Sequence, residues 1–321
     1  MPFHSGFVSI VGRPNAGKST LLNALVGEKL AIVTRKPQTT RNRIQGIVNV
    51  ERNGKRPAGQ IVLIDTPGVH KPVNSLNRRM MKEVYDALEG CDLLLLIVDA
   101  TAKFGTGDKF VLDLLRKRGT RTFLLLNKID AIDKQELLPL IARYKELRDF
   151  AEVIPISALK HQGLDVLLDA VIKVLPEGPR YFPKDQITDQ PERFLVTELI
   201  REQVLLATEQ EVPYATAVLI DSYEERPKLT TIAATIYCER EGQKAILIGK
   251  RGEMLKKIGT AARLQIERLL NTKIFLELFV KVRPGWRDSR QFVEETDWRR
   301  QLERMSAGER TTDGVDEDLE P

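Results

Sequence analysis

The sequence predicts an α/β domain built on a mostly parallel, doubly wound sheet, followed by a smaller α+β domain. In the first 178 residues, apolar runs of strand length are separated by helical patterns, which is typical of βαβ units. The prolines and the glycine of residues 176–179 then interrupt this alternation. Beyond them, a helix precedes two successive strands, so a second architecture begins there.

The strands of the first domain follow from its apolar runs. They are expected near residues 7–11, 44–50, 60–64, 92–98, 121–126 and 152–156. After a loop, the first strand is followed by a helix expected through Leu21, Leu22, Leu25 and Val26, and the last helix should span residues 164–175. The run at 93–98 lies between two aspartates, which fits a buried sheet strand and is far too short to cross a bilayer.

The composition is that of an intracellular globular chain. Its 321 residues are 42% hydrophobic and 30% charged, and this length is typical of about two domains. Cys91 and Cys238 lie far apart beside apolar runs, so we expect two buried free thiols in a reducing compartment. No basic region precedes the first apolar run, so we do not expect a secretory signal.

The first strand leads into a phosphate-loop pattern, Gly-Arg-Pro-Asn-Ala-Gly-Lys-Ser, at residues 12–19. Two glycines and a proline shape a loop whose backbone N–H groups point inward, and the next helix adds its positive dipole end. Lys18 would reach the β- and γ-phosphates, and the Ser19 hydroxyl would bind Mg²⁺. The expected contacts are Gly12, Asn15, Ala16, Gly17, Lys18, Ser19 and Thr20.

An Asp-Thr-Pro-Gly motif at residues 65–68 follows the strand expected at 60–64. Asp65 would hold the Mg²⁺ through water, and the Gly68 N–H would sense a γ-phosphate. Thr66 is expected to line the same site.

Two further motifs follow strands at the carboxyl edge of the sheet, where open α/β sheets bind ligands. The Asp130 carboxylate is complementary to the paired N–H donors of guanine, which adenine lacks. Asn127 and Lys128 would tie the base-binding loop to the phosphate loop. Backbone N–H groups for the base oxygen are expected from Ser157, Ala158 and Leu159. The four motifs in this order predict a GTP-binding domain.

Residues 33–41, within the irregular stretch 27–43, are where a switch loop is expected, because the stretch follows the phosphate-binding helix. A hydroxyl there would complete the Mg²⁺ shell when the γ-phosphate is present, and we choose Thr40 over Thr39. The second switch should run from Gly68 to Arg79. Lys18, Thr40 and Gly68 are therefore the expected catalytic residues.

The residue after Asp-Thr-Pro-Gly is Val69, where many small GTPases carry a water-orienting glutamine. An apolar side chain cannot orient water by hydrogen bonding, so we expect slow intrinsic turnover that is open to stimulation. His70 is a candidate for this task, and an ordinary surface histidine is the alternative.

A Gly-x-x-Gly turn at residues 249–252 joins an apolar segment to a helix, with strands expected near 215–221, 229–238 and 274–282. Glycines let a nucleic-acid backbone approach closely, and this arrangement is typical of a KH domain, which clamps about four single-stranded nucleotides. The expected RNA-binding residues are Ile248, Gly249, Lys250, Arg251, Gly252, Lys256, Lys257, Lys281, Arg283, Trp286 and Arg287.

The charge distribution supports this interpretation. Residues 240–290 hold 13 Lys or Arg against 5 Asp or Glu, whereas residues 185–239 hold 4 against 11. A charged stretch is also compatible with a solvated face of no special function. Trp286 lies between Arg283 and Arg287 and either stacks a base or packs in the core.

These motifs resemble those of the Era family of bacterial GTPases. The resemblance covers residues 5–290 and rests on the runs at 12–20, 37–41, 65–70, 127–130, 157–159, 187–191, 201–203, 248–252 and 278–282. It implies a P-loop GTPase domain at 1–178, a linker at 179–186, a type II KH domain at 187–290 and a charged, disordered tail at 291–321.

The family implies a GTP-hydrolysing factor of small (30S) ribosomal subunit assembly and rRNA maturation, whose KH domain binds the 3′ end of 16S rRNA. GTP would favour RNA binding, and RNA would stimulate hydrolysis. Family members are cytoplasmic, some attached peripherally to the inner membrane, and we expect a monomer. Asn15 matches the asparagine that helps hold K⁺ in potassium-stimulated relatives, although asparagine also suits a tight loop.

The chain departs from a minimal family member after residue 290. Residues 294–304 carry mixed charge and would extend a helix, and residues 313–320 hold five acids and no base. That acidic stretch would shield the RNA surface or simply aid solubility. Two other functions stay open: action on another RNA or a protein, and membrane-associated signalling. The absence of a lipidation motif or polybasic run argues against the latter.

Overall fold

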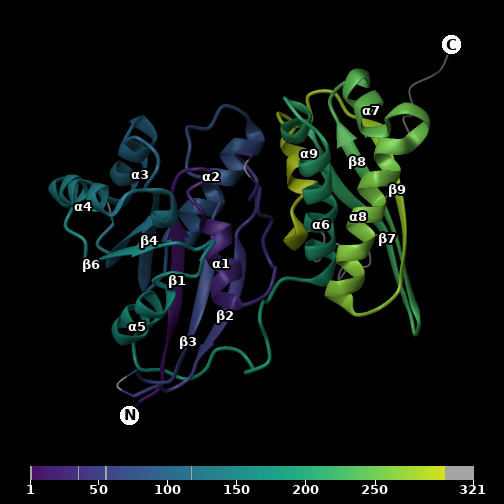
Figure 1. The fold of residues 1–321 in the computed structure, drawn as a ribbon. Helices are drawn as coiled ribbons and strands as arrows, with labels where there is room; N and C mark the ends of the chain where they lie inside the picture. The colour runs from purple at the N-terminus through teal and green to yellow at the C-terminus, as the bar shows by residue number, and fades with distance from the viewer. Residues whose placement is uncertain (1, 35, 55, 117, 301–321) are drawn as a thin grey trace. The chain divides into compact units, whose positions relative to one another are not determined.

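The computed structural model describes residues 2–34, 36–54, 56–116 and 118–300, and Figure 1 shows the order of their helices and strands. The chain divides into two compact units, of which the first ends at Pro191 and the second begins at Glu192. None of the described helices combines the length and apolarity that a membrane span requires.

The first unit contains a six-stranded sheet in the order β2-β3-β1-β4-β5-β6. Its strands are β1 His4–Val11, β2 Ile44–Val50, β3 Gly59–Asp65, β4 Leu93–Asp99, β5 Thr122–Asn127 and β6 Glu152–Ile156. Every neighbouring pair is parallel except β2 and β3. The prediction of a mostly parallel, doubly wound sheet is confirmed.

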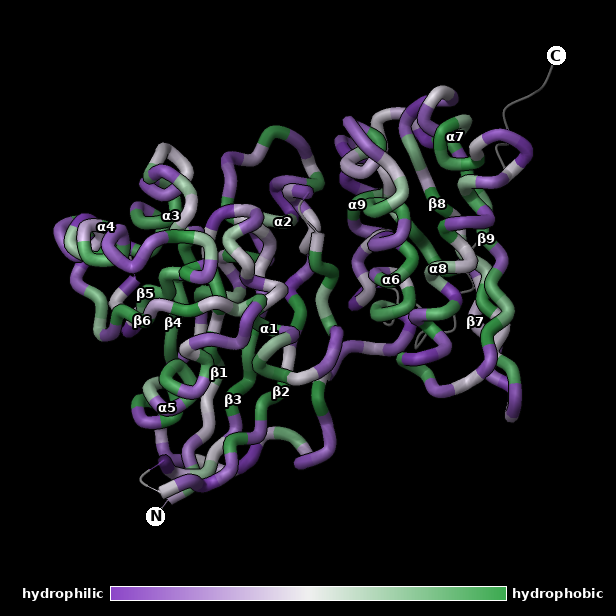
Figure 2. The backbone as a smooth tube through the Cα atoms, viewed as in Figure 1, coloured by the Kyte–Doolittle hydropathy of each residue, from purple (hydrophilic) through white to green (hydrophobic). Residues whose placement is uncertain are grey.

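Helices cover both faces of this sheet because its central strands are apolar on both sides. The helices are α1 Lys18–Val26, α2 Ser75–Leu88, α3 Thr106–Arg116, α4 Lys134–Leu147 and α5 Leu164–Val174, with a 3₁₀ turn η1 at Ile129–Ala131. Side chains of α2, α3 and α4 pack with Leu94, Leu96 and Leu124 in one core cluster. Helix α1 packs against β2 and β3, and α5 against β1, β3 and β6. Figure 2 shows the hydrophobic residues concentrated along the strands.

The segment that leaves the first unit, residues 181–190, lies along the edge strand β2, and we call it the strap. The Ile47 N–H donates to the Ile187 carbonyl at 2.8 Å, and the Thr188 hydroxyl donates to the Gln45 carbonyl at 2.6 Å. The expected linker at 179–186 and the expected start of the second domain at 187 thus both fall before the end of the first compact unit.

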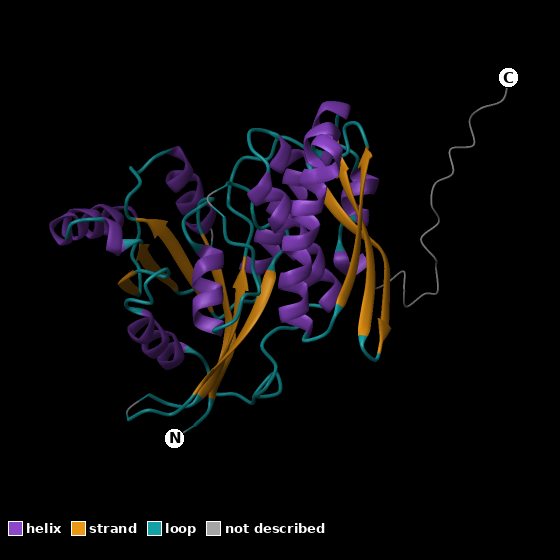
Figure 3. Ribbon diagram, turned by 45° about the vertical axis from the view of Figure 1, so that its right-hand side comes forward, coloured by secondary structure: helices purple, strands orange, loops and turns teal. Residues whose placement is uncertain are grey.

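The second unit is an α+β domain with a three-stranded sheet in the order β7-β8-β9. Its elements are α6 Glu192–Ala207, η2 Val212–Ala215, β7 Ala217–Arg226, β8 Leu229–Cys238, α7 Glu241–Ile248, η3 Lys250–Gly252, α8 Glu253–Leu270, β9 Ile274–Val282 and α9 Arg290–Glu295. Strands β7 and β8 are antiparallel, and β8 and β9 are parallel. Helices α6 and α8 pack together and contact β7 and β9, respectively. Figure 3 shows these strands and helices by type.

The prediction of a disordered tail at 291–321 is wrong for residues 291–300. Phe292 and Val293 in α9 are buried, and the Phe292 ring packs edge-on against Trp286 and Tyr237, with centroids 5.8 and 5.0 Å away. Two apolar residues among the charges therefore anchor this segment to the domain. The helix expected within 294–304 has its first two residues in α9, which ends at Glu295, and residues 298–300 are helical again. Residues 301–304 of that prediction, and the acidic stretch, lie outside the described residues.

Candidate nucleotide-binding site and nucleic-acid interface

The phosphate loop connects β1 to α1, and close packing requires both of its glycines. Gly17 has a φ of 100°, and a Cβ there would lie 2.1 Å from Asn127 Nδ2. A Cβ at Gly12 would lie 2.4 Å from the Ile97 carbonyl oxygen. The loop is therefore held directly against the ends of β4 and β5, as the carboxyl-edge location predicts.

Lys18 is buried inside this loop. Its ammonium donates to the carbonyl oxygens of Gly12 and Arg13 at 3.3 and 3.0 Å. Burial lowers the pKa of Lys18, and the nearby Asp65 charge opposes that shift. A cation with this little water around it interacts strongly with a phosphate. Around it, Ala16 is buried, Ser19 and Thr20 are half-buried, and Asn15 is exposed with a φ of 63°.

The three predicted metal ligands lie together. Ser19 Oγ donates to Asp65 Oδ2 at 2.6 Å and lies 2.8 Å from Thr40 Oγ1, which donates to the same carboxylate at 3.3 Å. Thr39 instead donates to the Lys36 carbonyl at 2.6 Å, so the choice of Thr40 agrees with the geometry.

The electrostatics of this cluster fit a divalent cation. Asp65 Oδ1 is buried without a hydrogen-bond partner among the described residues. Burial raises the pKa of Asp65 to about 6, against the opposing effects of the Lys18 charge and of the hydrogen bonds from Ser19 and Thr40. Two hydroxyls and one carboxylate are hard oxygen donors of the kind Mg²⁺ prefers, and its charge would offset the burial of Asp65.

The Asp-Thr-Pro-Gly loop packs against the phosphate loop. The buried Thr66 hydroxyl donates to the Ile10 carbonyl at 2.8 Å, so that hydroxyl ties β3 to β1. A Cβ at Gly68 would lie 2.7 Å from Pro14 Cγ, so the contact between the loops requires glycine. The Val69 side chain belongs to the core, as expected of a residue that does not orient water.

His70 has one ring nitrogen engaged and one without a partner. Nδ1 lies 2.8 Å from the Gly68 carbonyl oxygen. Because a carbonyl only accepts, Nδ1 carries the proton, and Nε2 of the neutral ring keeps its lone pair. Nε2 is buried and has no hydrogen-bond partner in the described part of the chain. The ring is therefore preset to accept a hydrogen bond at Nε2.

Asn127 connects the phosphate loop to the loop at 157–159. Its Nδ2 donates to the Ala16 carbonyl at 2.8 Å, and its Oδ1 accepts from the Ala158 N–H at 3.0 Å. A base oxygen at this loop would therefore share the Ala158 N–H with Asn127. The Ser157 N–H donates to the Gln162 carbonyl at 3.0 Å.

Lys128 forms its hydrogen bond elsewhere than expected. Its ammonium lies 2.5 Å from Asp99 Oδ2 rather than at the phosphate loop. Burial alone would raise the pKa of Asp99, but hydrogen bonds from Lys128 and Thr101 outweigh it and lower the pKa. Asp99 ends β4 as Asp65 ends β3, and this shared position is the signal that would have identified it.

The residue that is expected to select guanine is accessible. Asp130 is exposed in the turn η1, and Leu159 is exposed as well, whereas Ser157 and Ala158 are buried.

The sequence motifs do not predict two contacts that the phosphate loop and the expected switches make. Arg13 pairs with Asp108 of α3 at 2.7 Å, so α3 holds the phosphate loop from outside. Just after Thr40, the Asn42 side chain accepts from Arg79 of α2 at 2.5 Å. The residue that follows the first expected switch by one position is thereby bonded to the second expected switch.

The Gly-x-x-Gly turn has the backbone that its glycines permit. Gly252 has a φ of 82° and precedes α8, and a Cβ there would meet nothing within 4 Å, so its outer side is open. Arg251 takes the left-handed conformation with a φ of 53°. Lys250 and Arg251 are exposed at the tip, and Gly249 packs against Met254.

The other predicted RNA-binding residues divide into accessible and engaged groups. Ile248 is half-buried, and Lys256, Lys257 and Lys281 are exposed. Arg283 lies 4.1 Å above the Phe292 ring, and Arg287 pairs with Glu239 at 3.0 Å.

Trp286 does not belong to the RNA surface. The side chain is fully buried, and its Nε1 donates to the Ala215 carbonyl at 2.8 Å. Of the two interpretations, base stacking is therefore wrong and core packing is right. The flanking arginines lie on the surface of the domain, but flanking charge does not reveal which way an intervening ring points.

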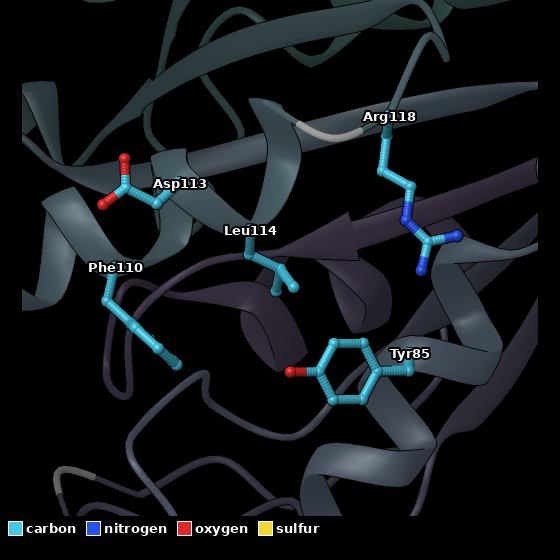
Figure 4. A pocket seen from close by; sticks show the side chains of 5 residues that line it. All are labelled: Tyr85, Phe110, Asp113, Leu114 and Arg118. Carbon is cyan, nitrogen blue, oxygen red and sulfur yellow. The ribbon is translucent and has the colours of Figure 1, made fainter.

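A separate surface cavity of about 470 Å³ lies on the first unit (Figure 4). Tyr85 of α2, Phe110, Asp113 and Leu114 of α3, and Arg118 line it. It contains none of the predicted nucleotide-binding residues.

Comparison with known proteins agrees with this geometry. Residues 7–128 match the family described as 50S ribosome-binding GTPase, and residues 211–287 match the KH domain. A protein named GTPase Era from Geobacter metallireducens is 52% identical over 296 residues, which cover 92% of this chain and 97% of that protein. GTPase Era from Syntrophus aciditrophicus is 50% identical over 91% of this chain and 94% of its own length.

Solved structures of Era proteins are also similar to this chain over most of its length. An Aquifex aeolicus Era variant bound to GDP·AlF₄⁻ is 38% identical, with a TM-score of 0.86 over 91% of this chain and 98% of its own. Era in complex with MgGDPNP and nucleotides 1506–1542 of 16S ribosomal RNA is 38% identical, with a TM-score of 0.87 over the same shares. The chain belongs to the Era family of GTPases, with an amino-terminal GTPase domain and a carboxy-terminal KH domain.

Proposed function

We propose that this GTPase is a switch protein that binds the 3′ end of 16S rRNA through its KH domain and acts in 30S subunit assembly and rRNA maturation. The observation that carries the proposal is the presence, in one chain, of the Ser19–Thr40–Asp65 cluster and an open Gly-x-x-Gly turn. The relative bound to MgGDPNP and 16S rRNA nucleotides, which is similar over 91% of this chain, supports the choice of RNA.

The chemistry proposed for the nucleotide site is positioning and charge neutralisation. The backbone of the phosphate loop and the Lys18 ammonium hold the β- and γ-phosphates. Ser19 and Thr40 bind Mg²⁺ and Asp65 orients its water, while the Gly68 N–H contacts the γ-phosphate. Hydrolysis removes the γ-phosphate that would hold Thr40 at the Mg²⁺. Thr40 would then leave the metal, and the first switch would be released.

Asn15 is the proposed ligand of a K⁺ ion beside the phosphates, where the ion would supply positive charge in place of an arginine finger. The exposed, left-handed position of Asn15 in the loop supports this assignment. Turnover should be faster in K⁺ than in Na⁺ buffer. Equal turnover in the two buffers would contradict it.

We place the protein in the cytoplasm as a monomer, with peripheral attachment to the inner membrane as a secondary location. Residues 240–290 carry a net positive charge, which would attract both RNA and anionic lipid. Vesicle flotation that persists after RNase treatment would favour the membrane-associated alternative over RNA binding.

The test of the proposed function is a GTPase assay with and without an oligonucleotide of the 3′ end of 16S rRNA. We expect the oligonucleotide to stimulate turnover and an oligonucleotide of scrambled sequence to have no effect. The matched control is Gly252→Asp, which places a carboxylate and an unfavourable φ in the turn and should abolish stimulation. Stimulation by both sequences alike would contradict the choice of the rRNA 3′ end.

A further inference from the structure

The edge strand of the second sheet presents alternating aromatic and charged side chains to solvent. In β9, Leu276, Leu278 and Val280 pack on the core of the domain, so the odd-numbered residues face the other way. These are Phe275, Glu277, Phe279 and Lys281, which we call the β9 stripe. Phe275 is 52% exposed and Phe279 is 51% exposed.

The register of the sheet explains why both rings stay uncovered. Phe275 pairs with Thr231, Glu277 with Ala233 and Phe279 with Thr235 on β8. Small side chains at these three positions cannot cover a phenyl ring. Two large aromatic rings on an open sheet edge promote unwanted association unless a partner uses them.

We propose that the β9 stripe stacks bases of single-stranded RNA outside the four nucleotides held at the Gly-x-x-Gly turn, an inference that rests on the proposed function. Two rings four residues apart on one strand are separated by about 13 Å, and exposed aromatic rings stack any base. Lys281 supplies a cation for the phosphate backbone. The Glu277 carboxylate, between the rings, accepts from the amino group of cytosine or adenine.

Helix α8 connects the Gly-x-x-Gly turn to the strand that carries the stripe. Helix α8 begins at the turn, and a Cβ at its Gly259 would lie 3.4 Å from Leu278 of β9. Leu278 is on the inner side of the strand whose outer side carries Phe279. RNA that passes from the turn to the stripe therefore follows α8 for about 10 Å and then crosses β9, and a strand occupies about 5 Å of a sheet.

The charges favour RNA over the other occupants of such a face. Residues 240–290, which contain the stripe, hold 13 basic and 5 acidic residues, and this net positive charge is complementary to the RNA backbone. Insertion of both rings into a bilayer would bury the Glu277 carboxylate without a hydrogen-bond donor, which is costly, whereas the amino groups of RNA bases can donate to it.

The experiment measures oligonucleotide binding by a Phe275→Leu/Phe279→Leu double variant, which keeps an apolar strand and removes the aromatic faces. The probes are a four-nucleotide and a twelve-nucleotide RNA from the 16S rRNA 3′ end. We expect the dissociation constant of the longer RNA to rise by about 10- to 100-fold, while that of the tetranucleotide stays as in the wild type. Leu206→Ala, which alters an exposed leucine on α6, is the matched control and should change neither value.

Gly252→Asp separates this proposal from the proposed function, because it should weaken binding of both RNAs. Suppose that Gly252→Asp weakens binding of both RNAs and the double variant binds both like the wild type. Base stacking at the stripe is then overturned, whereas RNA binding at the Gly-x-x-Gly turn is supported. If the wild type sediments as a dimer that the double variant abolishes, the stripe is an interface between copies and the RNA proposal is likewise overturned.

Discussion

The Asn127 side chain contacts two loops that lie far apart in the sequence, and several residues of the site act in this way. Its amide bonds the phosphate loop through Ala16 and the loop at 157–159 through Ala158. Asp65 likewise accepts from Ser19 and Thr40. Because one short side chain fixes two loops, small changes at these residues should affect nucleotide affinity more than the stability of the fold.

Base selection is expected to depend on Asp130. Asp130→Asn replaces an acceptor pair by a donor and an acceptor, which matches the base of XTP rather than that of GTP. We expect GTP affinity to fall by roughly 100-fold, because two charge-assisted hydrogen bonds are lost. XTP should bind more tightly than GTP to this variant, as measured by competition against a fluorescent nucleotide. A variant that still prefers GTP would contradict the assignment.

Water orientation is expected to depend on Nε2 of His70. His70→Ala should lower the RNA-stimulated kcat by about 100-fold with little change in KM, because only the orientation of water is lost. His70→Gln, which carries an acceptor near the position of Nε2, should recover part of the rate. His70→Asn keeps only the group near Nδ1 and should not recover it. Stimulated hydrolysis that is unchanged in His70→Ala would remove His70 as the candidate.

Residues of the nucleotide site could be predicted where a motif follows a strand end. Ser19, Thr40 and Asp65 meet because the motif order already places them at one edge of a parallel sheet. The Lys128–Asp99 pair was missed because its geometry depends on β4 lying beside β5. The burial of Trp286 was undecided because neighbouring charges do not tell which way a ring points.

Strand β2 is the element that connects the first switch to the chain leaving the GTPase unit. It begins at Ile44, directly after Asn42 and Arg43, which follow the first expected switch, and its edge is bonded to the strap. Gln60 of β3 adds to this contact, because its amide bonds the strap backbone at residues 181 and 182, each at 2.9 Å. A change at the switch can therefore displace the start of β2 and, with it, the strap.

Thr188→Val tests this mechanical connection. The change removes the hydroxyl that donates to the Gln45 carbonyl and accepts from the Gln190 N–H, and it keeps the side-chain shape. We expect intrinsic GTP hydrolysis to stay as in the wild type. The ratio of RNA affinities between the GTP-analogue and GDP states should fall by about 5-fold, because one hydrogen bond contributes about 1 kcal/mol.

Thr197→Val is the matched control for the strap variant. Thr197 of α6 donates to the Arg193 carbonyl at 2.9 Å, so it loses a comparable bond away from β2. Its affinity ratio should equal that of the wild type. An unchanged ratio in Thr188→Val would show that the strap does not transmit the state of the switch.

Among the secondary-structure elements, the sequence predicts the strands better than the segments that connect or follow them. The runs at 44–50, 152–156, 229–238 and 274–282 have the bounds of β2, β6, β8 and β9, because apolar alternation and turn residues define them locally. The strap was expected to be a linker, because its bonds to β2 depend on tertiary contact. Helix α9 was missed because two buried residues among charges give too short a pattern.

In the whole molecule, the proposed switch requires that nucleotide binding and RNA binding be energetically coupled. Linkage makes this coupling reciprocal: if the γ-phosphate strengthens RNA binding, RNA strengthens binding of the triphosphate by the same factor. The described contacts give this coupling a physical path from Thr40 through β2 to the strap, which continues into α6. The affinity of each ligand should therefore depend on the other.

The most direct measurement is the dissociation constant of a 16S rRNA 3′-terminal oligonucleotide for the protein loaded with a non-hydrolysable GTP analogue, loaded with GDP, or free of nucleotide. We expect the oligonucleotide to bind most tightly in the GTP-analogue state, with a dissociation constant about 10-fold lower than in the GDP state. Three equal dissociation constants would contradict it, because the nucleotide would then have no influence on the RNA-binding domain.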